Sequence, residues 1–244
     1  MRYLINLTYD GSKYFGYQVQ NNNITVEGQI EKVLSKILNT NINTIASSRT
    51  DRGVHAYNQY CHFDYDKKID LKKLKHSINS LIDDSIYIKN IKKVNSDFHA
   101  RYSVSRKEYI YKINMKEYNP IEKDYVLQYC KKIDKDLLDK FISKLNGEHN
   151  FKSFTSDKDA KNYIRNISID YKISNKILYL KISSSGFLRY MIRNIVGLLL
   201  DINDNKKNIN DIDKIIDSQS RCKLGLCAPA CGLYLNKIEY WHKY

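Results

Sequence analysis

Alternating apolar and polar residues at the start of the chain predict a β-strand. From Arg2 to Asp10 every second residue is aromatic or aliphatic, and this period of two is typical of a strand with one buried face. Apolar residues then recur at helical spacing after Thr25, whose hydroxyl can cap the first turn of a helix. The same spacing after Asp70 predicts a second helix, and residues 86–94 are expected to form a strand. The first part of the chain is therefore expected to alternate strands and helices.

A similar mixture of strands and helices is expected in the rest of the chain. Further strands are expected over residues 106–114, 164–173, 177–184 and 233–240. Asp134 can cap a helix that ends near Gly147, and a strongly apolar helix is expected over residues 188–200. The polar stretch 155–162 is expected to be a surface loop.

This order of elements predicts an α+β fold with two similar halves. The expected domains are residues 1–104 and residues 105–244. Their strands are expected to form a mixed, mainly antiparallel central sheet with flanking helices. A chain of 244 residues is long enough to bury a substantial core in this arrangement.

The charge balance favours a polyanionic partner. Lys and Arg together number 41 and Asp and Glu 27, which gives a net charge of +14 at pH 7, so nucleic acid is the first candidate. The 21 tyrosines offer rings on which bases can stack, although many of them must fill the core. Ile, Asn, Lys and Tyr are plentiful along the whole chain, so part of this excess is attributed to a bias in composition.

The sequence carries no sign of export or of a membrane span. The N-terminus lacks a basic region followed by a sustained apolar stretch, and the apolar run 195–200 is far short of the roughly 20 residues that span a bilayer. Five cysteines without an export signal are typical of a reducing compartment, so a soluble cytoplasmic protein is expected. The spacing of Cys222, Cys227 and Cys231 fits no common metal site.

One stretch carries the strongest chemical signal. Arg49, Thr50, Asp51, Arg52 and Gly53 follow one another between two strand-like segments. An aspartate between two guanidinium groups is held ionised, which suits a nucleophile, and the glycine permits a sharp turn. The alternative is a surface turn with an Asp–Arg ion pair, and the short motif alone leaves both interpretations open.

A second signal comes from Arg193. It lies in the apolar helix expected over residues 188–200, one turn after Arg189, so at least its stem is expected to be buried. Burying an unpaired guanidinium group is costly, so Arg193 needs an anion. Asp51 is a good candidate for that anion.

Ordered sequence blocks extend along nearly the whole chain. They are Tyr9-Asp10-Gly11, Gly16-Tyr17-Gln18, Thr25-Val26-Glu27-Gly28, Arg49-Thr50-Asp51-Arg52-Gly53-Val54-His55-Ala56, Phe98-His99-Ala100-Arg101, Arg106-Lys107-Glu108-Tyr109, Gly147-Glu148-His149-Asn150-Phe151, Phe187-Leu188-Arg189-Tyr190-Met191-Ile192-Arg193-Asn194, Ala228-Pro229 and Gly232-Leu233-Tyr234-Leu235. In these blocks the chain resembles the tRNA pseudouridine synthase A family.

The resemblance implies an isomerase that converts uridine to pseudouridine in the anticodon stem-loop of tRNA, at positions 38, 39 and 40 in tRNA numbering. It implies Asp51 as the catalytic aspartate, Arg193 as the arginine that pairs with it, and Tyr109 as the ring on which the base stacks. Arg49 and Arg52 are taken as further substrate-binding residues. On this assignment, residues 1–104 carry the catalytic loop and residues 105–244 complete the active-site cleft. The resemblance implies no cofactor and no metal, and it implies that the working unit is a homodimer.

The chain departs from the family pattern at three positions near the motif. Ser48 stands where glycine is usual, Arg52 where alanine is usual, and Tyr17 where tryptophan is common. None of these changes touches a catalytic side chain. Arg52 adds charge beside Asp51, where it could contact a phosphate group.

Two rival functions and three chemical routes stay open from the sequence. The chain could be a non-catalytic RNA-binding protein in which Asp51 is a structural turn residue, or it could modify another structured RNA. An aspartate can attack the base at C6, attack the sugar at C1′, or assist an elimination. In each route the uridine must leave the base stack at a cost of a few kcal/mol, and stacking on Tyr109 would return about 1–3 kcal/mol.

Overall fold

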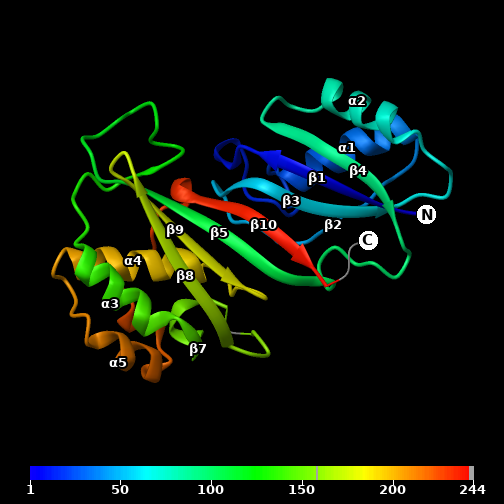
Figure 1. The fold of residues 1–244 in the computed structure, drawn as a ribbon. Coiled ribbons are helices and arrows are strands. Elements are labelled where there is room, and N and C mark those ends of the chain that lie inside the picture. The colour runs from blue at the N-terminus through cyan, green and yellow to red at the C-terminus, as the bar shows by residue number, and fades with distance from the viewer. Residues whose placement is uncertain (158, 242–244) are drawn as a thin grey trace. The chain divides into compact units, whose positions relative to one another are not determined.

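The computed structural model describes residues 1–157 and 159–241, which form two compact units (Figure 1). Unit 1 comprises residues 1–107 and 234–244, and unit 2 comprises residues 108–233. The last strand thus belongs with the first part of the chain. The expected division at residues 104 and 105, which assigned a role to each half, stays a prediction.

Unit 1 is a sheet with helices packed on it. Its elements are β1 (Arg2–Tyr9), α1 (Val26–Leu38), β2 (Ile45–Ala46), β3 (His55–Asp64), α2 (Leu71–Leu81), β4 (Ile86–Val94) and β10 (Leu233–Tyr240). The strands lie in the order β4-β1-β3-β10, with β2 beside β3. Strand β1 is antiparallel to β3 and β4, whereas β10 is parallel to β3, with Tyr234 opposite His55.

The two helices of unit 1 pack together, and α2 lies against β4 (Figure 1). They bury the apolar side of the strands because the helices carry apolar residues at helical spacing and the strands at every second position. The fully buried side chains include Ile5 and Leu7 on β1, Ile30 and Leu34 on α1, and Ile78 on α2.

Unit 2 has the same kind of construction. Strand β5 (Val104–Asn114) carries the chain from unit 1 into unit 2. The other elements are β6 (Leu127–Gln128), α3 (Lys135–Leu145), β7 (Gly147–Asn150), β8 (Ile164–Ser174), β9 (Ile177–Ser184), α4 (Met191–Asn203) and α5 (Asp211–Ser218). The strand order is β5-β9-β8-β7, with β6 parallel to β5 and with β8 antiparallel to both β7 and β9. Helix α3 packs on β8 and α4, and α5 packs beside β7.

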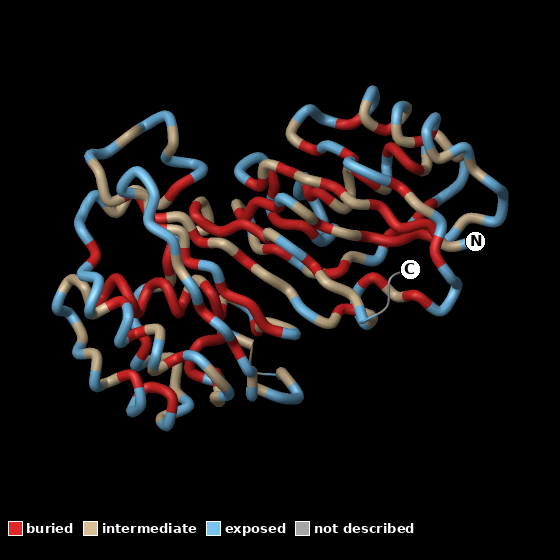
Figure 2. Tube along the Cα trace, in the orientation of Figure 1, coloured by how far each residue is buried: buried red, intermediate tan, exposed pale blue. Residues whose placement is uncertain are grey.

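The expected fold class is confirmed, because both units combine helices with mixed, mainly antiparallel strand pairing. Buried residues follow the strands and the inner sides of the helices, and exposed residues follow the outer turns (Figure 2). Within the described residues, no helix is long and apolar enough to cross a membrane.

The expected helix starts are confirmed at three places. Thr25 accepts a hydrogen bond from the Gly28 amide, Asp70 accepts from two amides of α2, and Asp134 accepts from the Leu137 amide. The described residues of the expected loop 155–162 form no helix or strand; residue 158 lies outside the described part.

The expected start of the apolar helix is wrong. Helix α4 begins at Met191 rather than at residue 188, and Arg189 lies in the turn before it. Tyr190 adopts a left-handed conformation with φ of 62°, which stops the helix from extending toward the N-terminus. The apolar spacing extends through this turn and could not reveal the change of backbone direction.

Candidate active site

The Asp51 segment is a tight turn between β2 and β3. Gly53 has a φ of +79°, which favours glycine, and the Val54 amide donates a hydrogen bond of 3.1 Å to the Asp51 carbonyl oxygen. The turn leaves Asp51 half-buried and Arg52 exposed. A half-buried carboxylate at a fixed turn can be aimed at a reacting group while a substrate still reaches it.

A second loop, residues 10–18, supports this turn from within unit 1. The Tyr17 amide donates to the Thr50 carbonyl oxygen at 3.1 Å, and the hydroxyl groups of Tyr9 and Thr50 are hydrogen-bonded at 2.8 Å. Gly16 has a φ of +100°, and a Cβ atom there would lie 3.0 Å from the Thr50 carbonyl oxygen. The two loops therefore meet backbone to backbone at a position that only glycine fits without strain.

The residues just before the turn are held by side chains. The Gln59 side chain makes two hydrogen bonds here: its Nε2 atom donates to the Ser48 carbonyl oxygen at 2.7 Å, and its Oε1 atom accepts from the Ser47 hydroxyl at 2.6 Å. Lys107 donates to the Ser47 carbonyl oxygen at 2.7 Å, and burial lowers the pKa of Lys107 to about 8. The buried backbone oxygens at the entrance to the turn thus have donors, as buried polar groups require.

His55, at the far end of the turn, has a structural position. Its Nδ1 atom accepts a hydrogen bond from the Gly11 amide at 3.1 Å, and its ring stacks on Tyr234 with centroids 4.6 Å apart. A Cβ atom on Gly11 would lie 1.9 Å from the Val54 carbonyl oxygen, so no larger residue fits there. The histidine of the motif locks the turn to loop 10–18.

Both arginines that flank Asp51 are exposed in unit 1. The guanidinium carbon of Arg52 lies 4.1 Å from the centroid of the Phe15 ring, which is a cation–π contact. Burial raises the pKa of Glu27, which lies in the first turn of α1, and the charge of Arg49 partly opposes this rise. The Arg49 side chain is therefore close to the start of α1. These positions add positive charge to the surface around the turn.

Tyr109 belongs to unit 2, where it is almost fully buried on β5. Its ring meets Phe187 edge to face, with centroids 5.4 Å apart. Two residues further on, Tyr111 points to the same face of the strand and donates to the Pro229 carbonyl oxygen at 2.6 Å. The Tyr109 ring is therefore held in a rigid aromatic setting.

Arg193 lies in the first turn of α4 and is only half-buried. Its Nε atom donates to the Ala228 carbonyl oxygen at 2.7 Å, and its guanidinium carbon lies 5.3 Å from the Tyr190 ring centroid. Burial raises the pKa of Tyr111, and the Arg193 charge acts in the opposite direction, so the two side chains are close. The backbone bond to Ala228 fixes one edge of the guanidinium group.

The five predicted site residues are thus divided between the units. Arg49, Asp51 and Arg52 share one turn of unit 1, whereas Tyr109 and Arg193 lie in unit 2. The pairing of Asp51 with Arg193 stays a prediction.

Two neighbours of the turn in unit 1, Phe15 and Lys107, were not expected from the sequence. The signal for Phe15 is an aromatic residue in an otherwise polar loop. The signal for Lys107 is a lysine directly before Glu108 and Tyr109. The side chain of Cys222 lies outside the described part, so the interpretation of the three cysteines stays untested.

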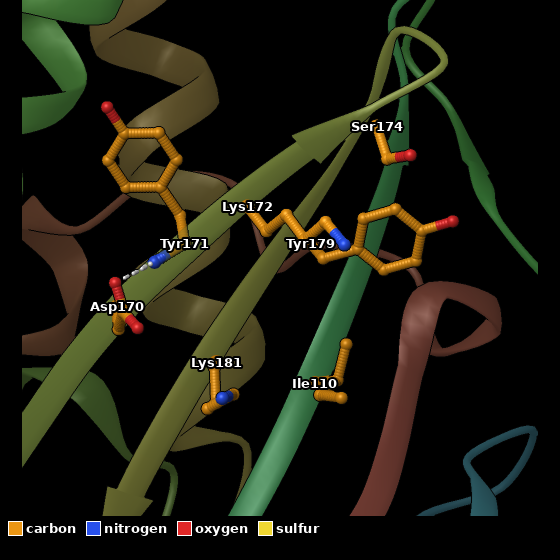
Figure 3. A pocket seen from close by; sticks show the side chains of 7 residues that line it. All are labelled: Ile110, Asp170, Tyr171, Lys172, Ser174, Tyr179 and Lys181. Carbon is orange, nitrogen blue, oxygen red and sulfur yellow. Dashed lines mark hydrogen bonds between the residues drawn. The ribbon is translucent and has the colours of Figure 1, made fainter.

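Unit 2 also contains a hollow of about 320 Å³ on its sheet (Figure 3). It is lined by Ile110, Asp170, Tyr171, Lys172, Ser174, Tyr179 and Lys181. Ile110 follows Tyr109 on β5, and successive strand side chains point to opposite faces, so the hollow lies on the face away from the Tyr109 ring. The predicted site residues do not line it, and it is not the expected uridine site.

Comparisons with known proteins identify the family. The sequence profile described as "tRNA pseudouridine synthase" matches residues 7–103 and 141–241. The tRNA pseudouridine synthase A of Mycoplasmoides gallisepticum is 41% identical over 239 residues, which are 97% of this chain and 90% of that protein. The enzyme of the same name from Caldicellulosiruptor bescii is 38% identical over 240 residues, covering 97% of this chain and 98% of the relative.

The enzyme of that name from Mycoplasma genitalium is 37% identical over 241 residues, covering 98% of both chains. Among solved structures, a chain in "Crystal Structure of a Cbf5-Nop10-Gar1 Complex" matches with a TM-score of 0.31 and 10% identity, over 78% of this chain and 52% of that one. This last likeness is too weak to carry an argument. The profile and the full-length relatives confirm the resemblance, and the chain belongs to the tRNA pseudouridine synthase family, whose members are isomerases that act on tRNA.

Proposed function

We propose that the protein isomerises uridine to pseudouridine at positions 38, 39 and 40 of the tRNA anticodon stem-loop, with Asp51 as the catalytic residue. The observation that carries the proposal is the setting of Asp51. The carboxylate sits half-buried on a turn whose neighbouring backbone is held by loop 10–18, Gln59 and Lys107. Such a rigid support is what a catalytic group needs and an ordinary surface turn does not.

The reaction breaks the bond from N1 of uracil to C1′, turns the base and joins C5 to C1′. C5 loses its proton to the solvent and N1 takes up a proton, so no atom is gained or lost overall. Asp51 acts on the base or the sugar, and its carboxylate serves each of the three possible routes. Tyr109 provides the ring on which the flipped base stacks, and Arg193 pairs with Asp51 to offset the cost of burying its charge. Arg49 and Arg52 bind the RNA. The reaction is redox-neutral and adds no atoms, which is consistent with an enzyme that needs no cofactor.

The surrounding charge supports RNA as the substrate. With a net charge of +14, the protein favours a polyanion over a small neutral molecule. We propose further that it acts as a homodimer in the cytoplasm and that folded tRNA binds across both subunits. Sedimentation of the protein with and without tRNA tests the dimer directly.

Release of tritium tests the catalytic role. Isomerisation at a uridine labelled with tritium on C5 releases the label to water, so the wild-type protein should release it from a labelled tRNA transcript. Asp51→Asn should release none while binding tRNA within a few fold of wild type, because phosphate contacts supply most of the binding energy. Mass spectrometry of the variant must exclude deamidation back to Asp.

Asp84→Asn is the matched control, because Asp84 is a highly exposed carboxylate that pairs with Lys13 on the supporting loop. This variant should release tritium at the wild-type rate. Turnover by pure Asp51→Asn would show that Asp51 is not the catalytic residue, whereas no turnover by the wild-type protein would support the non-catalytic RNA-binding rival. Equal release from a transcript without uridine at positions 38, 39 and 40 would show that the enzyme modifies a different site.

A further inference from the structure

Phe15 and Arg52 form a cation–π pair on the surface of unit 1. The guanidinium carbon lies 4.1 Å from the ring centroid, and the phenylalanine is 40% exposed although it is a large apolar residue. A ring exposed to this extent contributes little to the core. The pair lies directly beside the carboxylate to which we assign the chemistry, since Arg52 follows Asp51 in the chain.

Both partners are held in place by backbone contacts. The Phe15 amide donates to the Ile24 carbonyl oxygen at 3.0 Å, and the Gln20 side chain donates to the Phe15 carbonyl oxygen at 2.9 Å. Next to Phe15, a Cβ atom on Gly16 would lie 3.3 Å from the Arg52 amide nitrogen. The loops that carry the ring and the guanidinium group are thus in direct contact, and the ring contact restricts the Arg52 side chain before a ligand binds.

The Arg52 guanidinium group makes no ion pair and donates no hydrogen bond within the described part of the chain. Lys13, on the same supporting loop, differs in this respect because it pairs with Asp84 at 3.2 Å. A guanidinium group that lies against a ring has its N–H donors at its edges, where they face water. This fork geometry matches two oxygens of one phosphate group.

We propose that the Phe15–Arg52 pair binds a phosphodiester group of the RNA that flanks the uridine held at Asp51. The ligand is a phosphate in the backbone rather than a base, because the donors at the edge of a guanidinium group suit paired anionic oxygens. The pair is a positioning site: it fixes the strand on one side of the flipped nucleotide. The proposal rests on the proposed function only in taking Asp51 as the place where the uridine enters.

Salt dependence of tRNA binding gives the first test. Binding is measured in the Asp51→Asn background, so that the substrate is not consumed. Adding Arg52→Ala should weaken tRNA binding about threefold to tenfold. This loss lies between the contribution of an exposed ion pair and that of a charge-assisted hydrogen bond. The slope of log affinity against log salt should become shallower by about 0.7 to 0.9, the loss expected for one phosphate contact.

Three further variants separate the cation–π pair from charge alone. Lys36→Ala is the matched control, because Lys36 is an exposed lysine in the last turn of α1 and should change the slope less than Arg52→Ala. Arg52→Lys should keep the slope but recover only part of the affinity, since a lysine lacks the planar fork. Phe15→Leu should weaken binding about twofold to fivefold through loss of the cation–π contact.

Replacement of single phosphates in the RNA gives the decisive test. Transcripts are assembled with one neutral methylphosphonate linkage at successive positions around the target uridine. If Arg52 holds one flanking phosphate, a single linkage should weaken binding to the Asp51→Asn protein and have no further effect once Arg52 is also alanine. In the catalytically active protein, Arg52→Ala should mainly raise KM, because this contact exists before and during the reaction.

The proposal is overturned if no linkage couples to Arg52→Ala, if the slope changes no more than for Lys36→Ala, or if Arg52→Lys restores full affinity. These results are independent of the catalytic assignment. Turnover by Asp51→Asn would remove the proposed function and leave the binding data valid, whereas an inactive Asp51→Asn with no coupled linkage would remove only the phosphate site.

Discussion

Replacing Gly16 by alanine should slow the reaction without removing any functional group. Gly16 lies in the supporting loop with φ of +100°, and the new Cβ atom would lie 3.0 Å from the Thr50 carbonyl oxygen and 3.3 Å from the Arg52 amide nitrogen. Both of these atoms belong to the backbone on either side of Asp51. The substitution therefore presses directly on the turn that carries the proposed nucleophile.

Two effects add up at this position. A side chain at this φ costs of order 1–3 kcal/mol of folding stability, because L-residues rarely adopt the conformation. The close contacts then require the Asp51 turn to move by a few tenths of an ångström. Since a displacement of 1 Å can cost about a hundredfold in rate, the smaller shift should lower the single-turnover rate about threefold to tenfold.

Gly147 separates the two effects. It has nearly the same backbone conformation, with φ of +104°, but a Cβ atom there would meet no heavy atom within 4 Å. Gly147→Ala should therefore lose the same 1–3 kcal/mol in urea unfolding and keep the wild-type rate of tritium release. The reasoning fails if Gly147→Ala slows the reaction as much as Gly16→Ala, or if Gly16→Ala reacts at the wild-type rate.

Two further predictions concern Arg193 and His62. Arg193→Ala should lower the single-turnover rate if it leaves the Asp51 charge unpaired. Because both side chains are only half-buried, the loss should be smaller than the roughly 3–5 kcal/mol of a fully buried pair, about tenfold to a hundredfold in rate, and an unchanged rate would separate Arg193 from the chemistry. Burial, with the charges of Arg2 and His99, lowers the pKa of His62 to about 4, so the folded protein keeps this ring neutral while the unfolded chain protonates it below about 6.5. Stability should therefore fall as the pH drops from 6.5 toward 4, by up to about 1.4 kcal/mol per pH unit from this residue. His62→Asn, which can still accept the bond from the Ala100 amide, should lose less stability over that range in urea unfolding, and an equal loss would contradict the assignment.

Local signals gave the parts of the fold that depend on few neighbouring residues. The caps at Thr25, Asp70 and Asp134 could be predicted because a short polar side chain and the next turn decide them. The parallel pairing of β10 with β3 could not be predicted, because residues 234 and 55 are far apart in the sequence and no local pattern encodes their contact. The helix start at Met191 was also hidden, because the backbone turns at Tyr190 while the apolar spacing continues.

The candidate site divides in the same way. Asp51 was found because its chemistry is visible in a run of adjacent residues. Lys107 was missed because it acts on the carbonyl oxygen of Ser47, and every residue has such an oxygen, so the sequence gives no sign of which one needs a donor. Phe15 was missed for a related reason, since its partner Arg52 lies on another loop.

The construction of the Asp51 turn bears on the catalytic role that we propose for it. Three supports of the turn come from unit 1: the Tyr9 hydroxyl bonds to the Thr50 hydroxyl, the Gln59 side chain donates to the Ser48 carbonyl oxygen, and the Gly11 amide donates to His55. Each of these supports holds the backbone or a side chain next to Asp51. None of them covers the half-buried carboxylate, which a substrate can still approach. If Asp51 is the catalytic residue, as we propose, a turn supported in this way needs little rearrangement when uridine arrives, so the binding energy of the tRNA can be used to flip the base.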